Sequence, residues 1–179
     1  MRFGRPVGLK PGRRRTRSGW QMTMEAGVIA AFKMGLVGGQ RAMTPLAAVA
    51  IGIARGELPA RDGLSKLLGQ PLVAAGTLAL AIGEMAGDKQ KTAPDRIVPI
   101  GLAARFLTSA IAGAMLVPKR ERWWGAALAG TTAVVAAYPG WRLRMAALHR
   151  HGQTPTGFAE DVAVLTSAAR IVRGRAAEA

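Results

Sequence analysis

The chain has 179 residues, the size of one ordinary domain, and carries a formal net charge of +15. Half of its residues are hydrophobic but only 5% are aromatic, and alanine and glycine abound, as in membrane helices that pack closely. Because cysteine is absent, disulfides, thiolate metal sites and cysteine nucleophiles are excluded.

The positive charge is concentrated in an amino-terminal arm, residues 1–22. Seven of the 25 Lys and Arg residues lie in the first seventeen positions, and no acid precedes Glu25. Such an arm can bind nucleic-acid phosphates, but membrane proteins carry the same excess on their cytoplasmic side, and long apolar runs follow here. We therefore favour a membrane protein over a nucleic-acid-binding one. We expect a disordered cytoplasmic arm that contacts anionic lipid headgroups; an organelle transit peptide is an alternative.

Residues 25–54 form an apolar stretch that is too long for one straight span. As a continuous helix it would measure about 45 Å, against a hydrocarbon core of roughly 30 Å. Three residues that break or kink helices lie in its middle: Gly38, Gly39 and Pro45. The sequence predicts one helix to about Val37, a break that contains Arg41, and a second helix from about Thr44. This segment either crosses the membrane once or re-enters.

Two apolar spans are predicted in the middle of the chain, after a polar connection with a short interfacial helix at residues 65–69. The first span covers residues 71–86 and ends near Glu84 and Asp88, which share one helix face. The second covers residues 97–117. Only Arg105 interrupts it, about 12 Å from its start and close to the midplane.

The next span carries the most specific membrane signal. After a charged turn, residues 123–141 contain no charge, and Trp and Tyr side chains stand at both ends as an aromatic belt. Residues 142–156 are basic and polar and predict a loop. Thr156 is the expected N-cap of a last helix, which completes the bundle or lies at the interface before a short tail at residues 174–179.

These elements predict an all-α, polytopic transmembrane bundle over residues 23–173, with about five membrane-embedded segments. If the first segment crosses once, thirteen Lys and Arg residues lie on the side of the arm and six on the other. The positive-inside rule then places the amino terminus in the cytoplasm of a bacterium, with the chain in the inner membrane. A re-entrant first segment would invert the later spans, and we expect the count to argue against it.

Four sequence blocks, in this order, are shared with a known family. They are Gly38-Gly39-Gln40-Arg41-Ala42 followed by Pro45-Leu46; Glu84 followed by Asp88-Lys89 and Pro94; Arg105 with Ala112-Gly113-Ala114; and Glu160-Asp161-Val162. Over most of residues 26–172 the chain resembles the small bacterial integral membrane proteins catalogued as domain of unknown function 4126. The resemblance implies a polytopic helical fold and no established activity.

The candidate interior residues are the charges at membrane depth: Arg41, Glu84, Asp88, Arg105, Glu160 and Asp161. A central arginine costs about 2.5–3.5 kcal/mol, so we expect Arg41 and Arg105 to face the interior and to find a carboxylate. Paired in a dry core, they stabilise the bundle; lining water, they hold an anion or a lipid phosphate. Glu84 binds a cation, relays a proton, or pairs with Lys89 or an arginine.

The sequence favours a small transporter or channel with a charged interior, working as a homo-oligomer because so few helices enclose little space. The alternative is a non-catalytic membrane scaffold or partner subunit. An enzyme that acts on a membrane lipid is a distant third, and we expect no enzymatic activity. No cofactor is expected, and no metal site either, because His149 and His151 lack a third ligand nearby.

Overall fold

The structure is a computed structural model that describes residues 17–87, 98–151 and 153–178. Over these residues the fold is all-helical, as predicted. The seven α-helices are α1 (Arg17–Gln40), α2 (Met43–Ala54), α3 (Gly63–Leu68), α4 (Pro71–Gly87), α5 (Pro99–Leu116), α6 (Arg122–His151) and α7 (Gln153–Glu178), with a 3-10 turn, η1, at Lys119–Glu121.

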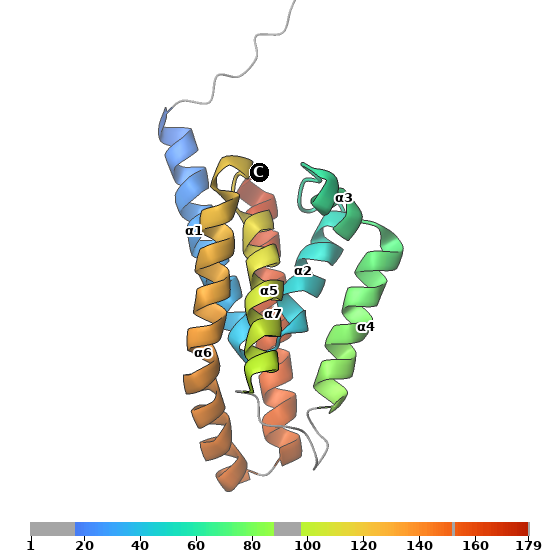
Figure 1. The fold of residues 1–179 in the computed structure, drawn as a ribbon, viewed down its shortest axis with the longest axis vertical. Coiled ribbons are helices and arrows are strands. Elements are labelled where there is room, and N and C mark those ends of the chain that lie inside the picture. The colour runs from blue at the N-terminus through green and yellow to red at the C-terminus, as the bar shows by residue number, and fades with distance from the viewer. Residues whose placement is uncertain (1–16, 88–97, 152, 179) are drawn as a thin grey trace, which may run out of the picture.

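Helices α1 and α2 form a V whose two open arms lie at the same end of the bundle (Figure 1). At that end, a Cβ on Gly27 of α1 would lie 3.2 Å from the carbonyl oxygen of Leu116. Beyond α2, Arg61 donates from Nη1 to the carbonyl of Val117 at 3.1 Å. The single-crossing arrangement is therefore wrong, because residues 25–54 enter the bundle and return. Helix α2, with 12 residues, is about 18 Å long and too short to cross.

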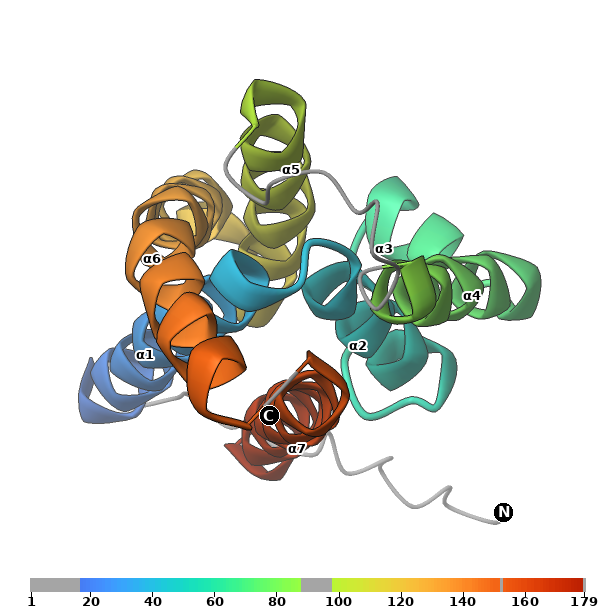
Figure 2. The same ribbon diagram turned by 90° about the horizontal axis from the view of Figure 1, so that it is seen from below.

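The other long helices run along the bundle in alternating directions. Helix α4 leads away from the end that holds α3, α5 returns to it, α6 leads away again, and α7 brings the carboxyl terminus back (Figure 1). The return of α7 is fixed by Arg175, whose Nε donates to the carbonyl of Leu116 at 3.0 Å. Figure 2 shows α4 at the edge of the bundle, packed on α2.

Helices α4 and α5 confirm that the two predicted middle segments are helical, and α3 and η1 lie where a short helix and a charged turn were expected. The predicted loop at residues 142–156 is wrong over its described part. Helix α6 continues through Pro139 to His151, and α7 begins at Gln153, so Thr156 lies inside a helix and is not its N-cap.

The ends of the chain are also more helical than expected. Residues 1–16 lie outside the described part, but α1 begins at Arg17, inside the arm that we expected to be disordered. Helix α7 extends to Glu178 through most of the predicted tail.

Small residues allow the helices to approach closely. Helix α1 continues through Gly38 and Gly39 to Gln40, so it ends about three residues later than predicted. A Cβ on Gly39 would lie 2.7 Å from the Cβ of Ala136, and one on Gly38 would overlap the Oγ of Ser109. These glycines therefore permit packing on α5 and α6 instead of ending the helix. Helix α5 also approaches α6 closely, since a Cβ on Gly113 would lie 2.5 Å from the Cβ of Ala129.

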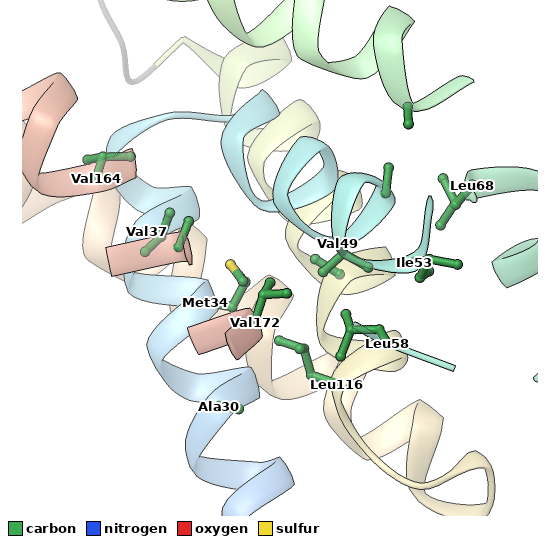
Figure 3. Close-up of a cluster of buried hydrophobic side chains, with 14 residues drawn as sticks. Ala30, Met34, Val37, Val49, Ile53, Leu58, Leu68, Leu116, Val164 and Val172 are labelled. Atoms are coloured by element: carbon green, nitrogen blue, oxygen red, sulfur yellow. The ribbon is translucent and has the colours of Figure 1, made fainter. Parts of the chain in front are cut away.

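A buried apolar cluster joins the V to α5 and α7. Figure 3 shows Met34 of α1, Val49 of α2 and Val172 of α7 within this cluster, with Leu116 nearby. Because each helix contributes small or medium side chains, the V is held against its neighbours mainly by close packing.

The outside of the bundle is unusually apolar. Leu72 and Ile100 are 84% and 81% exposed, and Trp123 and Trp124 are each 74% exposed. Within the described residues, one helix, α5, is both long and apolar enough to cross a membrane. Large exposed apolar surfaces mark contact with a membrane or with another protein.

Helix α3 begins with a capping box outside the apolar body. The Asp62 carboxylate accepts from the backbone N–H of Ser65 at 2.9 Å, and the Ser65 hydroxyl accepts from the backbone N–H of Asp62 at 2.9 Å. These bonds, led by the one from the Ser65 backbone, lower the pKa of Asp62 below its ordinary value of 3.8. Arg122 adds an ion pair at 3.3 Å.

Candidate functional site

The candidate site is the turn of the V, where α1 ends at Gln40 and α2 begins at Met43. A helix that stops inside a protein leaves carbonyl groups unbonded at its carboxyl end and N–H groups unbonded at its amino end. The hydrocarbon of a membrane cannot form hydrogen bonds with these groups, so inside a membrane other protein groups must do so. Each end of this break receives a charged side chain from another helix.

Glu84 of α4 satisfies the amino end of α2. One carboxylate oxygen accepts from the backbone N–H of Ala42 at 2.7 Å and the other from that of Met43 at 2.8 Å. A negative charge here also opposes the positive end of the helix dipole. The sequence predicted an interior role for Glu84, but within the described residues its partners are backbone groups and not an arginine.

Arg105 of α5 lies at the other side of the break and is 5% exposed. Its Nε donates to the carbonyl of Gly39, in the last turn of α1, at 3.3 Å. Three residues along α5, the hydroxyl of Thr108 donates to the carbonyl of Ala42 at 2.6 Å. A cation therefore faces the negative end of α1, the electrostatic opposite of Glu84 at α2.

Arg41, in the turn itself, is the most buried charge, with 1% exposure. Its Nε and Nη2 both donate to Oδ1 of Asp161 on α7, at 3.0 and 2.6 Å. Glu160 lies 4.0 Å from the same guanidinium and accepts from Arg144 of α6 at 3.0 Å. This arrangement confirms the expectation that Arg41 finds a carboxylate.

Two buried hydroxyl oxygens near the turn, Thr44 Oγ1 and Ser109 Oγ, have no hydrogen-bond partner among the described residues. Thr44 lies in the first turn of α2, next to Pro45, whose missing N–H is harmless at that position. Unsatisfied buried groups are rare in native proteins and often mark places where water or a ligand enters.

The fold thus gathers nearly all the residues singled out in the sequence. Those that meet at the turn are Gly38, Gly39, Arg41, Pro45, Glu84, Arg105, Glu160 and Asp161. Asp88 lies outside the described residues. The sequence did not indicate Arg144, because its stretch was predicted as a loop.

The described residues contain no group of three or more His, Cys, Asp or Glu side chains that could hold a metal ion. The arrangement is one of charged side chains around a helix break, some bound to the backbone at the helix ends and some to each other. It can stabilise the break and can also respond to a change of charge.

Comparisons of the chain with protein-family models, with curated proteins and with solved structures find no match.

Proposed function

We propose that the chain is an integral membrane protein with about five membrane-embedded segments: the V, α4, α5, α6 and α7. Its inverted polarity supports this proposal. Large apolar side chains cover the outside, whereas Arg41 and Arg105 are 1% and 5% exposed in the interior. Charged side chains in the interior and leucine side chains on the surface are expected of a protein that is surrounded by lipid. Membership of the family catalogued as domain of unknown function 4126 is part of the same proposal.

The re-entrant V also supports a cytoplasmic amino terminus in a bacterial inner membrane. With it, the arm and residues 55–69 and 118–122 share one side and carry thirteen Lys and Arg residues; residues 87–96 and 142–156 carry six. This excess is the one that the positive-inside rule places in the cytoplasm.

Within that membrane we propose a small transporter or channel whose gate is the turn of the V. The observation that carries the proposal is a discontinuous helix in the interior with both of its ends bound to charged side chains of other helices. Discontinuous helices of this kind hold solutes and coupling ions in many transporters. With Arg41 1% exposed, this conformation corresponds to a closed state.

A scaffold or partner subunit is the second candidate. One observation favours it: Arg41, Glu84 and Arg105 each bind a protein group, so the charges need no solute to satisfy them. In that case the apolar exterior binds another membrane protein and the turn is only structural.

Thiol labelling separates the two candidates, because the chain has no cysteine of its own. Ala104, next to Arg105, would be changed to Cys, and the full chain in proteoliposomes treated with a water-soluble methanethiosulfonate. The controls are Lys66→Cys, on exposed α3, and Leu107→Cys, 59% exposed on the apolar exterior of α5.

A transporter or channel predicts labelling at residues 66 and 104 with protection at 107. It also predicts efflux of protons, potassium or chloride that Glu84→Gln abolishes while helix content is unchanged. Labelling at residue 66 alone, without efflux of any of the three ions, would refute the transport proposal and leave the scaffold.

A further inference from the structure

A groove of about 690 Å³ runs between α1 and α7, separate from the turn contacts of Arg41. The two helices are antiparallel here, and the groove extends from the level of Arg175, near the end where α1 begins and α7 ends, to that of Gln40. Its walls are largely apolar, with Ala30, Val37 and Val164 among the lining residues. A cavity of this size is typical of a small-molecule site.

The charged side chains that line the groove are all cations: Lys33, Arg170 and Arg175. Lys33 and Arg170 are exposed, and among the described residues neither forms an ion pair or hydrogen bond. An anion from outside can therefore form charge-assisted hydrogen bonds with both side chains without displacing a protein partner.

The depth of these cations indicates what kind of anion fits. Gly27 is level with Leu116, the last residue of α5. Lys33 lies six residues further along α1, about 9 Å below that level. Arg170 lies five residues before Arg175, which bonds the Leu116 carbonyl, and so at about 8 Å. Long cationic side chains at this depth extend toward the headgroup region while their stems stay among apolar groups.

We propose that this groove is a binding site for an anionic phospholipid of the leaflet that faces the amino-terminal arm. The lipid phosphate lies between Lys33 and Arg170, and one acyl chain follows the apolar wall of α1 and α7 toward Gln40. Basic pockets between membrane helices bind lipid headgroups in this manner. The inference rests on the proposed membrane location. It places an acyl chain of this leaflet close to the helix break that contains Arg41.

The test is a titration of delipidated full-length protein in detergent with dioleoylphosphatidylglycerol, followed by native mass spectrometry. The variant is Lys33→Gln/Arg170→Gln. Its matched control is Lys66→Gln/Arg120→Gln, which removes the same charge from exposed positions away from the groove. Both retain the arm, so lipid bound there is common to the two proteins.

We expect the first lipid to bind about 30-fold more weakly to the groove variant than to the control, from about a factor of five for each cation. Ser167→Phe, an exposed lining position, should also weaken binding by filling the groove without changing charge. Equal affinity of variant and control would overturn the proposal. So would equal binding of dioleoylphosphatidylcholine, or displacement of the lipid by inorganic phosphate at the same concentration, since the site would then not select an anionic lipid.

Labelling at Ala104 and efflux are measured separately, so the two proposals fail separately. A groove variant that keeps efflux but loses lipid supports the lipid site. If efflux continues but the groove binds no lipid preferentially, only the lipid-site proposal is refuted.

Discussion

Removing the partner of Arg41 should destabilise the fold more than any change to a surface ion pair. In Asp161→Asn the guanidinium, 1% exposed, loses the anion to which it donates at 3.0 and 2.6 Å. A buried charge left without its partner costs about 3–5 kcal/mol. The surface pair of Arg122 and Asp62, whose side chains are 40% and 19% exposed, provides the contrast. Arg122→Gln should cost about 0–1 kcal/mol.

The measurement is unfolding of the purified chain in mixed micelles with increasing dodecyl sulfate, followed by circular dichroism. A double-mutant cycle completes the test. Arg41→Met and Asp161→Leu should each be strongly destabilising, but the double variant should be more stable than either, because it removes both charges of this pair. If Asp161→Asn lay within about 1 kcal/mol of the parent, or if the two single effects simply added, the pair would not stabilise the turn and the reasoning would be refuted.

Three further predictions use the same unfolding assay. Glu84→Gln keeps one acceptor but loses the charge, and it should lower the free energy of unfolding by about 1–2 kcal/mol. The control Glu57→Gln, near the other end of α2, should lower it by about 0.5 kcal/mol. Equal effects would contradict the capping of α2 by Glu84. Gly113→Ala should cost about 1–3 kcal/mol by overpacking, whereas Gly83→Ala, where a Cβ meets nothing within 4 Å, should be neutral or stabilising; the reverse order would contradict the packing. Because folding lowers the pKa of Asp62, its stabilisation is fully present above pH 3.8 and is lost as pH falls through the folded value, so Asp62→Asn should cost stability at pH 7 and progressively less below pH 3.8. A constant difference between parent and variant would contradict the shift.

The middle helices could be predicted from the sequence because uninterrupted apolar runs define them. Helix α4 spans Pro71–Gly87 and α5 spans Pro99–Leu116, each within about two residues of the predicted bounds. The candidate charges were also predictable, because an arginine in an apolar run must turn inward. Arg41 was expected to find a carboxylate, and it pairs with Asp161.

The path of the first segment could not be predicted from charge. Residues 55–69 and 118–122 carry three Lys or Arg residues each, and so do residues 87–96 and 142–156. The count is therefore thirteen against six whether residues 25–54 cross or re-enter. Only tertiary contacts, such as that of Arg61 with the Val117 carbonyl, distinguish the two paths.

The end of α6 was missed for a related reason. The run of basic and polar residues after Trp141 is typical of a loop. However, Arg144 forms an ion pair with Glu160 of α7 at 3.0 Å, and α6 continues through this run. A side chain's partner on a distant element is not visible in local composition, so local patterns underestimate helices stabilised in this way.

The charges at the turn follow from the shape of the V. Once α1 stops inside the bundle, its last carbonyls need a donor, and the first N–H groups of α2 need an acceptor. Arg105 and Glu84 supply these, and the sign of each charge matches the helix end that it contacts. The two side chains come from different helices, so a movement of α4 relative to α5 would break one contact before the other. Transport then requires exchange of these contacts during the cycle, whereas a scaffold requires that they never open. Labelling of a cysteine at residue 104 bears directly on that difference, because the neighbouring Arg105 is 5% exposed while it contacts the Gly39 carbonyl.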